Sequence, residues 1–321
     1  MMVGQKNTPM AALALCLAVA TTLTGCSSPE QNIKHPSTEE AGEGDTPNFD
    51  VSSQLRAVIA DVESEFDVRA GVSVADKKKT FNAGLKGHEP AWSTVKVPIA
   101  IAALRDGASL ELVDLAIKES DNDAAYALWS HVQWTEGDAG SAVKSLLKEY
   151  DSTGEFAEPF GYSTWSLEEQ AKFGAHLPCI PEAEQVYDAM DDIVEWQDNG
   201  LDKLPDTRAK GGWGLSETDN GYTHRQIGVR ETAGGGTAEN SAVGLAIEVT
   251  MPGEYADEAI PALDMLAAGV DRVVSEALKA RALTPLEGCA QPSAPSAVVG
   301  TSSTATREVS TNTSARRFGS R

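Results

Sequence analysis

Three short segments of this chain carry side chains that together could perform acyl transfer, and the first pairs a serine with a lysine. Ser93 and Lys96 lie just before the apolar run 97–101, so a helix beginning here would place the hydroxyl and the amine on neighbouring turns of one face. Burial would lower the pKa of Lys96, and a neutral amine can accept the proton of a serine hydroxyl. The same spacing recurs by chance in two further pairs on a lysine-rich amphipathic stretch: Ser141 with Lys144, and Ser145 with Lys148.

The second segment is Ser120-Asp121-Asn122, at the expected beginning of a helix. Serine, aspartate and asparagine are all preferred helix N-caps, so the segment has an ordinary structural interpretation. It lacks the third acidic ligand and the glycine of a calcium loop, which excludes that kind of site. By itself the segment is therefore a weak signal of chemistry.

The third segment is Lys210-Gly211-Gly212-Trp213, within an expected strand. Glycine weakens a strand, so two glycines here indicate either the close approach of a ligand or another backbone, or a bulge or bend. Taken alone, the segment favours the bulge or bend.

In this order the three segments resemble the active-site signatures of the penicillin-recognising serine hydrolase superfamily: Ser-x-x-Lys, Ser-Asp-Asn and Lys-Thr-Gly. That superfamily includes class A β-lactamases and D,D-peptidases. The stretches 91–98 and 115–125 also look like class A sequences, and the resemblance covers residues 54–279. It implies a helix-covered antiparallel sheet and acyl transfer from D-Ala-D-Ala-like peptides or β-lactams.

The resemblance implies a catalytic role for three residues. Ser93 would be the acylated nucleophile, and Lys96 its base or proton relay. Ser120 would pass a proton to the leaving nitrogen. Lys210, as a second cation, would help keep the Lys96 amine neutral.

It also implies how the substrate is held. Asn122 would bind the acyl amide, and Lys210 would attract the substrate carboxylate. The backbone N–H groups of Ser93 and Trp213 would form an oxyanion hole, two donors aimed at the charge of the tetrahedral state. Gly212 keeps the last glycine of the Lys-Thr-Gly signature and completes this substrate-binding set.

Two features depart from the class A pattern. Gly211 replaces the threonine whose hydroxyl would bind the substrate carboxylate. The Glu-x-x-Leu-Asn motif, whose glutamate activates the deacylating water, is absent between Asn122 and Lys210. Either Glu155 or Glu158 replaces that glutamate, or both belong to an acidic surface loop. Deacylation is therefore expected to be slow.

Apolar periodicity predicts the elements that must position these residues. Helices are expected over 54–66, 97–104, 110–117, 123–132, 142–150 and 261–278, and strands over 69–75, 208–215, 222–231 and 241–251. The three late strands follow one another without helices between them, which predicts antiparallel pairing. The expected fold class is α+β: an antiparallel sheet of about five strands flanked by helices, with an all-helical middle region.

The composition narrows the possible partners. With 41% hydrophobic and 23% charged residues in 321, the chain has the composition of a globular protein. A formal net charge of −22, from 26 Lys+Arg against 48 Asp+Glu, argues against a nucleic-acid partner. The five histidines lack metal-ligand spacing and the glycines at 234–236 do not fit a dinucleotide motif, so no metal or other cofactor is expected.

The N-terminus is typical of a bacterial lipoprotein. Lys6 precedes the apolar run 11–20, and the following Leu-Thr-Gly-Cys26 resembles a lipobox. Cleavage there would remove the signal peptide 1–25 and leave lipidated Cys26 to anchor the protein to the cell membrane, on its extracytoplasmic side. A plain secretory signal in which Cys26 is incidental is the alternative.

The expected mature chain has three parts: a flexible tether over 26–49, a β-lactamase-like serine hydrolase domain over 50–290, and a disordered Ser/Thr/Pro-rich tail over 291–321. Two cysteines fall outside the signal and the anchor. Cys179 and Cys289 are expected to form a disulfide, with two unpaired buried thiols as the alternative.

Three functions remain open from the sequence. The first is a lipid-anchored serine hydrolase acting on peptidoglycan peptides or β-lactams. The second is a noncatalytic lipoprotein that binds the cell wall with a degenerate β-lactamase fold, and the third is a true β-lactamase. Intact Ser93, Lys96, Ser120 and Asn122 favour chemistry over binding alone.

Overall fold

The structure, a computed structural model, describes residues 49–216, 221–232, 241–253 and 257–287. All of them belong to one unit of the chain, 46–321. Several predictions fall on other residues: the signal peptide 1–25, Cys26, the tether up to residue 48, Cys289 and the tail 291–321 lie outside the described residues.

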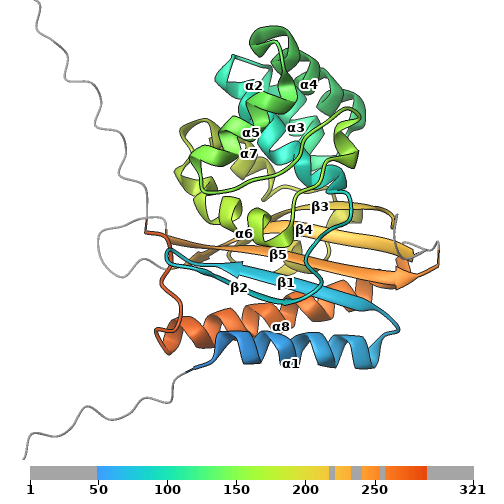
Figure 1. Ribbon diagram of the computed structural model, residues 1–321, viewed down its shortest axis with the longest axis vertical. Helices are drawn as coiled ribbons and strands as arrows, with labels where there is room; N and C mark the ends of the chain where they lie inside the picture. The colour runs from blue at the N-terminus through green and yellow to red at the C-terminus, as the bar shows by residue number, and fades with distance from the viewer. Residues whose placement is uncertain (1–48, 217–220, 233–240, 254–256, 288–321) are drawn as a thin grey trace, which may run out of the picture. The chain divides into compact units, whose positions relative to one another are not determined.

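A five-stranded antiparallel sheet forms the middle layer of this unit (Figure 1). Its strands, in spatial order, are β2 (Thr80–Gly84), β1 (Arg69–Ala75), β5 (Ser241–Pro252), β4 (Gly221–Thr232) and β3 (Thr207–Leu215). Strand β1 pairs with β5, so the two ends of the unit meet in the sheet. The expected α+β class and antiparallel pairing are confirmed.

The short strand β2 has no counterpart among the predicted strands. It has five residues, of which only Phe81 and Ala83 are buried, so its alternation is too brief to stand out from the sequence. Strand β2 forms by antiparallel pairing with residues Gly71 to Ala75 of β1.

Helices cover both faces of the sheet. Helices α1 (Val51–Glu65) and α8 (Ile260–Lys279) lie side by side on one face, and α6 (Leu167–His176) lies on the other (Figure 1). Because both faces are covered, β5 is buried over the ten consecutive residues 241–250 rather than at alternate positions.

Helix α1 begins at Val51, three residues before the predicted boundary. The Asp50 side chain accepts a hydrogen bond from the backbone N–H of Ser53 at 3.1 Å and caps the helix there. The predicted apolar face of this helix is confirmed, since Leu55, Val58 and Val62 are buried against the sheet and α8.

An all-helical region lies between β2 and β3, as expected. Its helices are α2 (Lys96–Arg105), α3 (Leu110–Lys118), α4 (Asn122–Glu136), α5 (Ala139–Glu149), α6 and α7 (Glu184–Ala189). Helix α2 is the centre of this region, with eight of its ten residues buried and contacts to α3, α4 and α5. Because α2 is held in place by this burial, the Ser93 turn that directly precedes it is held in place as well.

Across the ranges that the structure describes, we find no helix with the length and apolar content needed to span a bilayer.

Candidate active site

Ser93 lies in a single 3-10 turn, η1 (Trp92–Val95), that continues directly into α2. The helix was expected to open at Ser93; the α-helical part instead begins at Lys96, whose backbone N–H donates to the carbonyls of Ser93 and Thr94. Trp92 has a positive φ of 44°, a conformation that costs energy for a non-glycine residue. The tight turn presents Ser93 half-buried at the entrance to α2.

Lys96 connects the first segment to the second. Its Nζ donates to the Ser120 carbonyl at 2.5 Å, to Asn122 Oδ1 at 2.8 Å and to Ser120 Oγ at 3.3 Å. The side chain is 1% exposed, and burial lowers the pKa of Lys96 to about 8, against an opposing pull from Asp121. A substantial neutral fraction of this amine is therefore present near neutral pH.

The Ser120-Asp121-Asn122 segment has both of the interpretations that its sequence allows. Asp121 is the N-cap of α4, and its carboxylate accepts from the Ala124 N–H at 2.6 Å. The cap leaves Ser120 and Asn122 on the side that faces Lys96. Ser120 has a positive φ of 55°, which turns the chain sharply into the helix.

Lys210 connects the third segment to the second. Its Nζ donates to Gly211 O at 2.9 Å, to Ser120 Oγ at 3.1 Å and to Gln197 Oε1 at 3.3 Å. Burial, together with the charge of Lys96, lowers the pKa of Lys210 to about 7, while Asp202 acts in the opposite direction. Ser120 Oγ is thus the meeting point of both lysines.

The glycines of the third segment allow another backbone to approach β3. A Cβ at Gly212 would lie 2.7 Å from the Ser93 amide nitrogen and 2.9 Å from that of Thr94, and one at Gly214 would overlap the Trp92 ring. Strand β3 pairs residue by residue with β4 from Thr207 to Leu215, so there is no bulge in this stretch. The favoured bulge is therefore wrong, and close approach of the Ser93 turn is the reason for Gly212.

The Ser93 hydroxyl itself has no hydrogen-bond partner among the described residues. Lys96 Nζ is directed toward Ser120 and Asn122 instead. The structure therefore brings Lys96, Ser120, Asn122 and Lys210 together beside the Ser93 turn, without a hydrogen bond between the side chains of Ser93 and Lys96.

Arg225 is a positioning residue that sequence reasoning missed. It lies on β4 opposite Gly212 and is fully buried. Its guanidinium donates to the carbonyls of Glu89, Pro90 and Trp165 at 2.9–3.0 Å, and its Nε is 3.5 Å from the buried Glu248 carboxylate. Arg225 therefore attaches the chain just before the Ser93 turn to the sheet. No local signal in the sequence marks it.

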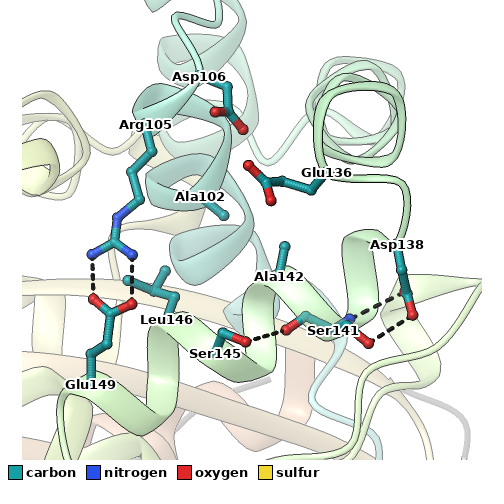
Figure 2. Close-up of a pocket in the computed structure, with 10 residues that line it drawn as sticks. All are labelled: Ala102, Arg105, Asp106, Glu136, Asp138, Ser141, Ala142, Ser145, Leu146 and Glu149. Atoms are coloured by element: carbon teal, nitrogen blue, oxygen red, sulfur yellow. Dashed lines mark hydrogen bonds and ion pairs between the residues drawn. The ribbon is translucent and has the colours of Figure 1, made fainter.

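The two chance copies of Ser-x-x-Lys lie on α5, and their serines, Ser141 and Ser145, line a cavity of about 310 Å³ (Figure 2). Ser141 Oγ donates to its capping residue Asp138 at 2.7 Å, and Ser145 Oγ donates to the Ser141 carbonyl at 2.9 Å. Lys144 pairs with Glu155 at 2.7 Å. The expected position of these pairs on a solvated helix face is confirmed. The two serine hydroxyls form hydrogen bonds within α5 and with its N-cap.

Of the two glutamates considered for water activation, Glu158 lies closer to α4. Tyr126 Oη donates to Glu158 Oε1 at 3.2 Å, and Tyr126 is one turn beyond Asn122 on α4. Glu155 is occupied by its ion pair with Lys144. The segment after Glu158 returns to the Ser93 turn, since the Ala91 N–H donates to the Ser163 carbonyl.

Cys179 ends the short 3-10 turn η3 (Leu177–Cys179). Cys289 lies outside the described residues, so the Cys179–Cys289 disulfide stays a prediction.

No protein-family model matches the chain, and no curated protein matches it by sequence. Several solved structures, however, match the chain in three-dimensional structure. A class A β-lactamase from Bacteroides cellulosilyticus matches with a TM-score of 0.56 and 14% identity, and a β-lactamase from Streptosporangium roseum with a TM-score of 0.53 and 15% identity. Each match covers 70% of this chain and 99% of the other.

The extended-spectrum β-lactamase TLA-1 is similar to the same extent, with a TM-score of 0.54 and 14% identity over 70% of this chain and 99% of its own. At such identities the likeness concerns the fold. The chain has the fold of class A β-lactamases, as the three segments of its sequence implied.

Proposed function

We propose that this protein is a serine hydrolase that is acylated at Ser93 by D-Ala-D-Ala-like peptides or β-lactams. The observation that carries the proposal is the convergence on one hydroxyl. Lys96 from α2 and Lys210 from β3 both donate to Ser120 Oγ, beside the turn that presents Ser93. Two buried amines around one hydroxyl supply a path for a proton between a nucleophile and a leaving group.

Acylation on a β-lactam would proceed as follows. Neutral Lys96 takes the proton of Ser93, and Ser93 Oγ bonds to the carbonyl carbon. The backbone N–H groups of Ser93 and Trp213 stabilise the oxyanion. The carbon–nitrogen bond then breaks, Ser120 gives its proton to the nitrogen, and the Lys96 ammonium reprotonates Ser120. Asn122 would hold the acyl amide.

Hydrolysis of the acyl-enzyme needs a base for water, a role worth about 10²–10⁴-fold. Glu158 is the better placed of the two candidates, because Glu155 is held by Lys144. Glu158 is exposed rather than enclosed, so neighbouring residues do not hold its side chain firmly beside the acyl group. We therefore expect acylation to be detectable and release to be slow.

The test is intact-mass measurement after adding penicillin. The expected result is an adduct of one acyl group on the wild-type chain, mapped to Ser93 and absent in Ser93→Ala. The Ser141→Ala variant is the matched control, because Ser141 occupies a chance copy of the same motif and its hydroxyl donates to Asp138, the N-cap of α5. Rapid multiple turnover would instead identify a true β-lactamase.

A noncatalytic protein that binds the cell wall is the second candidate. Two observations favour it: Ser93 Oγ has no hydrogen bond to Lys96 in the described residues, and glycine stands at position 211 in place of the signature threonine. Absence of any adduct at high penicillin concentration, with retained binding to isolated peptidoglycan, would decide for this candidate.

We propose further that lipid on Cys26 holds the protein at the outer side of the cell membrane. The sequence around Cys26 supports this, since the apolar run before it has the length of a signal h-region. The peptide part of peptidoglycan would then be within reach of the domain.

A further inference from the structure

The buried ammonium of Lys210 has no donor to spare for a substrate. A lysine carries three N–H donors, and the three acceptors around Nζ are Ser120 Oγ, Gln197 Oε1 and Gly211 O, at 2.9–3.3 Å. The side chain is fully buried. A carboxylate could bind Lys210 only by displacing one of these partners, each of which would then lose its own bond.

The second group that would receive a carboxylate is also missing. Gly211 offers no hydroxyl, although there is room for a side chain. A Cβ at this position would meet only Trp213 Cζ3 at 3.8 Å and Gln226 atoms at 3.9 Å, which is ordinary van der Waals contact. The space beside Gly211 is therefore bordered by the Trp213 ring and by Gln226 Nε2, whose N–H groups already donate to Asn199 O at 2.8 Å and Asp202 Oδ2 at 3.1 Å.

That ring belongs to an aromatic pair next to the site. Trp213 packs edge-to-face on Trp196, with ring centroids 5.7 Å apart at 81°, and stacks on His224 at 6.2 Å and 24°. Trp213 follows Gly212, and Trp196 precedes Gln197, the partner of Lys210. Trp196 is 67% exposed, so a ligand beside Gly211 can reach its ring.

We infer that the preferred acyl donor is neutral at its leaving group and places an apolar or aromatic leaving group against Trp196 and Trp213. This rests on the proposed acylation of Ser93 and ranks the donors: D-Ala-D-Ala-like peptides and penicillin carry a carboxylate on the leaving part, so they should acylate Ser93 more slowly than a donor that lacks it. A free carboxylate there would lose water without gaining a charged partner, whereas an aromatic group gains contact area. The acidic surplus of 48 Asp+Glu over 26 Lys+Arg also disfavours an anionic donor.

The experiment compares two thioesters that share the acyl group and a phenyl-bearing thiol. In one the thiol carries a free carboxylate, and in the other the methyl ester of that carboxylate. In either case Ser93 Oγ bonds to the carbonyl carbon, the carbon–sulfur bond breaks, and the Ser93 proton leaves on the thiol. Acylation of Ser93 is followed by intact mass, and thiol release by a thiol-reactive dye.

The expected result is acylation at least about tenfold faster from the neutral donor. The carboxylate of the anionic donor would lose water beside Gly211 without gaining a charged partner. Gly211→Thr, which supplies the missing hydroxyl, should lower that ratio by raising the rate of the anionic donor. Trp196→Ala should slow the neutral donor. Trp134→Ala is the matched control, because Trp134 is 89% exposed on α4 and should leave both rates unchanged.

Each outcome decides a different claim. A smaller ratio in the wild-type protein, or a ratio that Gly211→Thr leaves unaltered, overturns the selectivity while Ser93 acylation stands. If neither donor acylates Ser93, the proposed function itself fails and this inference falls with it.

Discussion

Lys96 and Lys210 share one acceptor: their Nζ atoms lie 3.3 and 3.1 Å from Ser120 Oγ. They come from the central helix α2 and the edge strand β3, 114 residues apart in the chain. Burial lowers the pKa of both lysines, to about 8 for Lys96 and about 7 for Lys210, and the charge of Lys96 adds to the lowering at Lys210. The pair is therefore poised to exchange protons near neutral pH.

The first prediction concerns the pH dependence of acylation. Because the base must be neutral Lys96, with a pKa of about 8, the rate of adduct formation on Ser93 should rise with pH and level off above about 8. The rate rises rather than falls because raising the pH removes a proton from the Lys96 ammonium, and only the neutral amine can accept the Ser93 proton. Rates from intact mass across this range provide the test, and a flat profile would exclude Lys96 as the base.

A methyl group at Gly212 should separate β3 from the Ser93 turn. The Cβ of Gly212→Ala would lie 2.7 Å from the Ser93 amide nitrogen, so the variant should lose about 1–3 kcal/mol of unfolding free energy and most of its acylation. Gly211→Ala is the neighbouring control, since its nearest contact is 3.8 Å away. Thermal unfolding and adduct formation check both, and equal behaviour of the two variants would refute the close-approach explanation.

Arg225 should be critical for stability. Arg225→Met removes three hydrogen bonds to carbonyls and leaves the buried Glu248 carboxylate without its cation, which should cost about 3–5 kcal/mol. Adding Glu248→Gln should restore part of it. Lys203→Met breaks a half-exposed pair with Asp264 and should cost less than about 1 kcal/mol. Denaturant unfolding measures the free energy of unfolding of each variant. Similar losses for Arg225→Met and Lys203→Met would show that Arg225 is not critical for stability.

The fourth prediction separates the two glutamates. Glu158→Gln should slow release of the acyl group from Ser93 by about tenfold, less than the roughly 10²–10⁴-fold effect of a well-positioned base, because Glu158 is exposed. Glu155→Gln should leave release unchanged, because Glu155 pairs with Lys144 on α5. Decay of the adduct mass with time is the measurement. Equal decay in the wild type and Glu158→Gln would show Glu158 to be a surface carboxylate.

The last prediction concerns the anchor. Cys26→Ala should release the protein from the membrane fraction, because each buried CH₂ of an acyl chain contributes about 0.8 kcal/mol and the variant would carry none. Fractionation with mass analysis of the N-terminal peptide checks it. A tightly held membrane fraction in the variant would rule out the lipobox interpretation.

Local sequence determined much of this protein. Hydrophobic periodicity located α1 to α5, α8 and four of the five strands to within a few residues, because amphipathic spacing reflects which face is buried. It did not locate α6 or α7. The sequence also placed the N-cap of α4 within Ser120-Asp121-Asn122, since a capping side chain bonds only three residues ahead, and the structure identifies Asp121 as the cap. The three site segments were visible because each is contiguous in the chain.

Only the tertiary structure decided among contacts between distant segments. Three Ser-x-x-Lys pairs look alike in sequence, but Lys96 is buried against Ser120 while Lys144 pairs with Glu155 on the surface. The close approach at Gly212, the attachment by Arg225 and the contact of Trp196 with Trp213 join residues that are not neighbours in the chain. Periodicity reports which face of an element is buried, whereas the partner on the other side depends on how the elements pack.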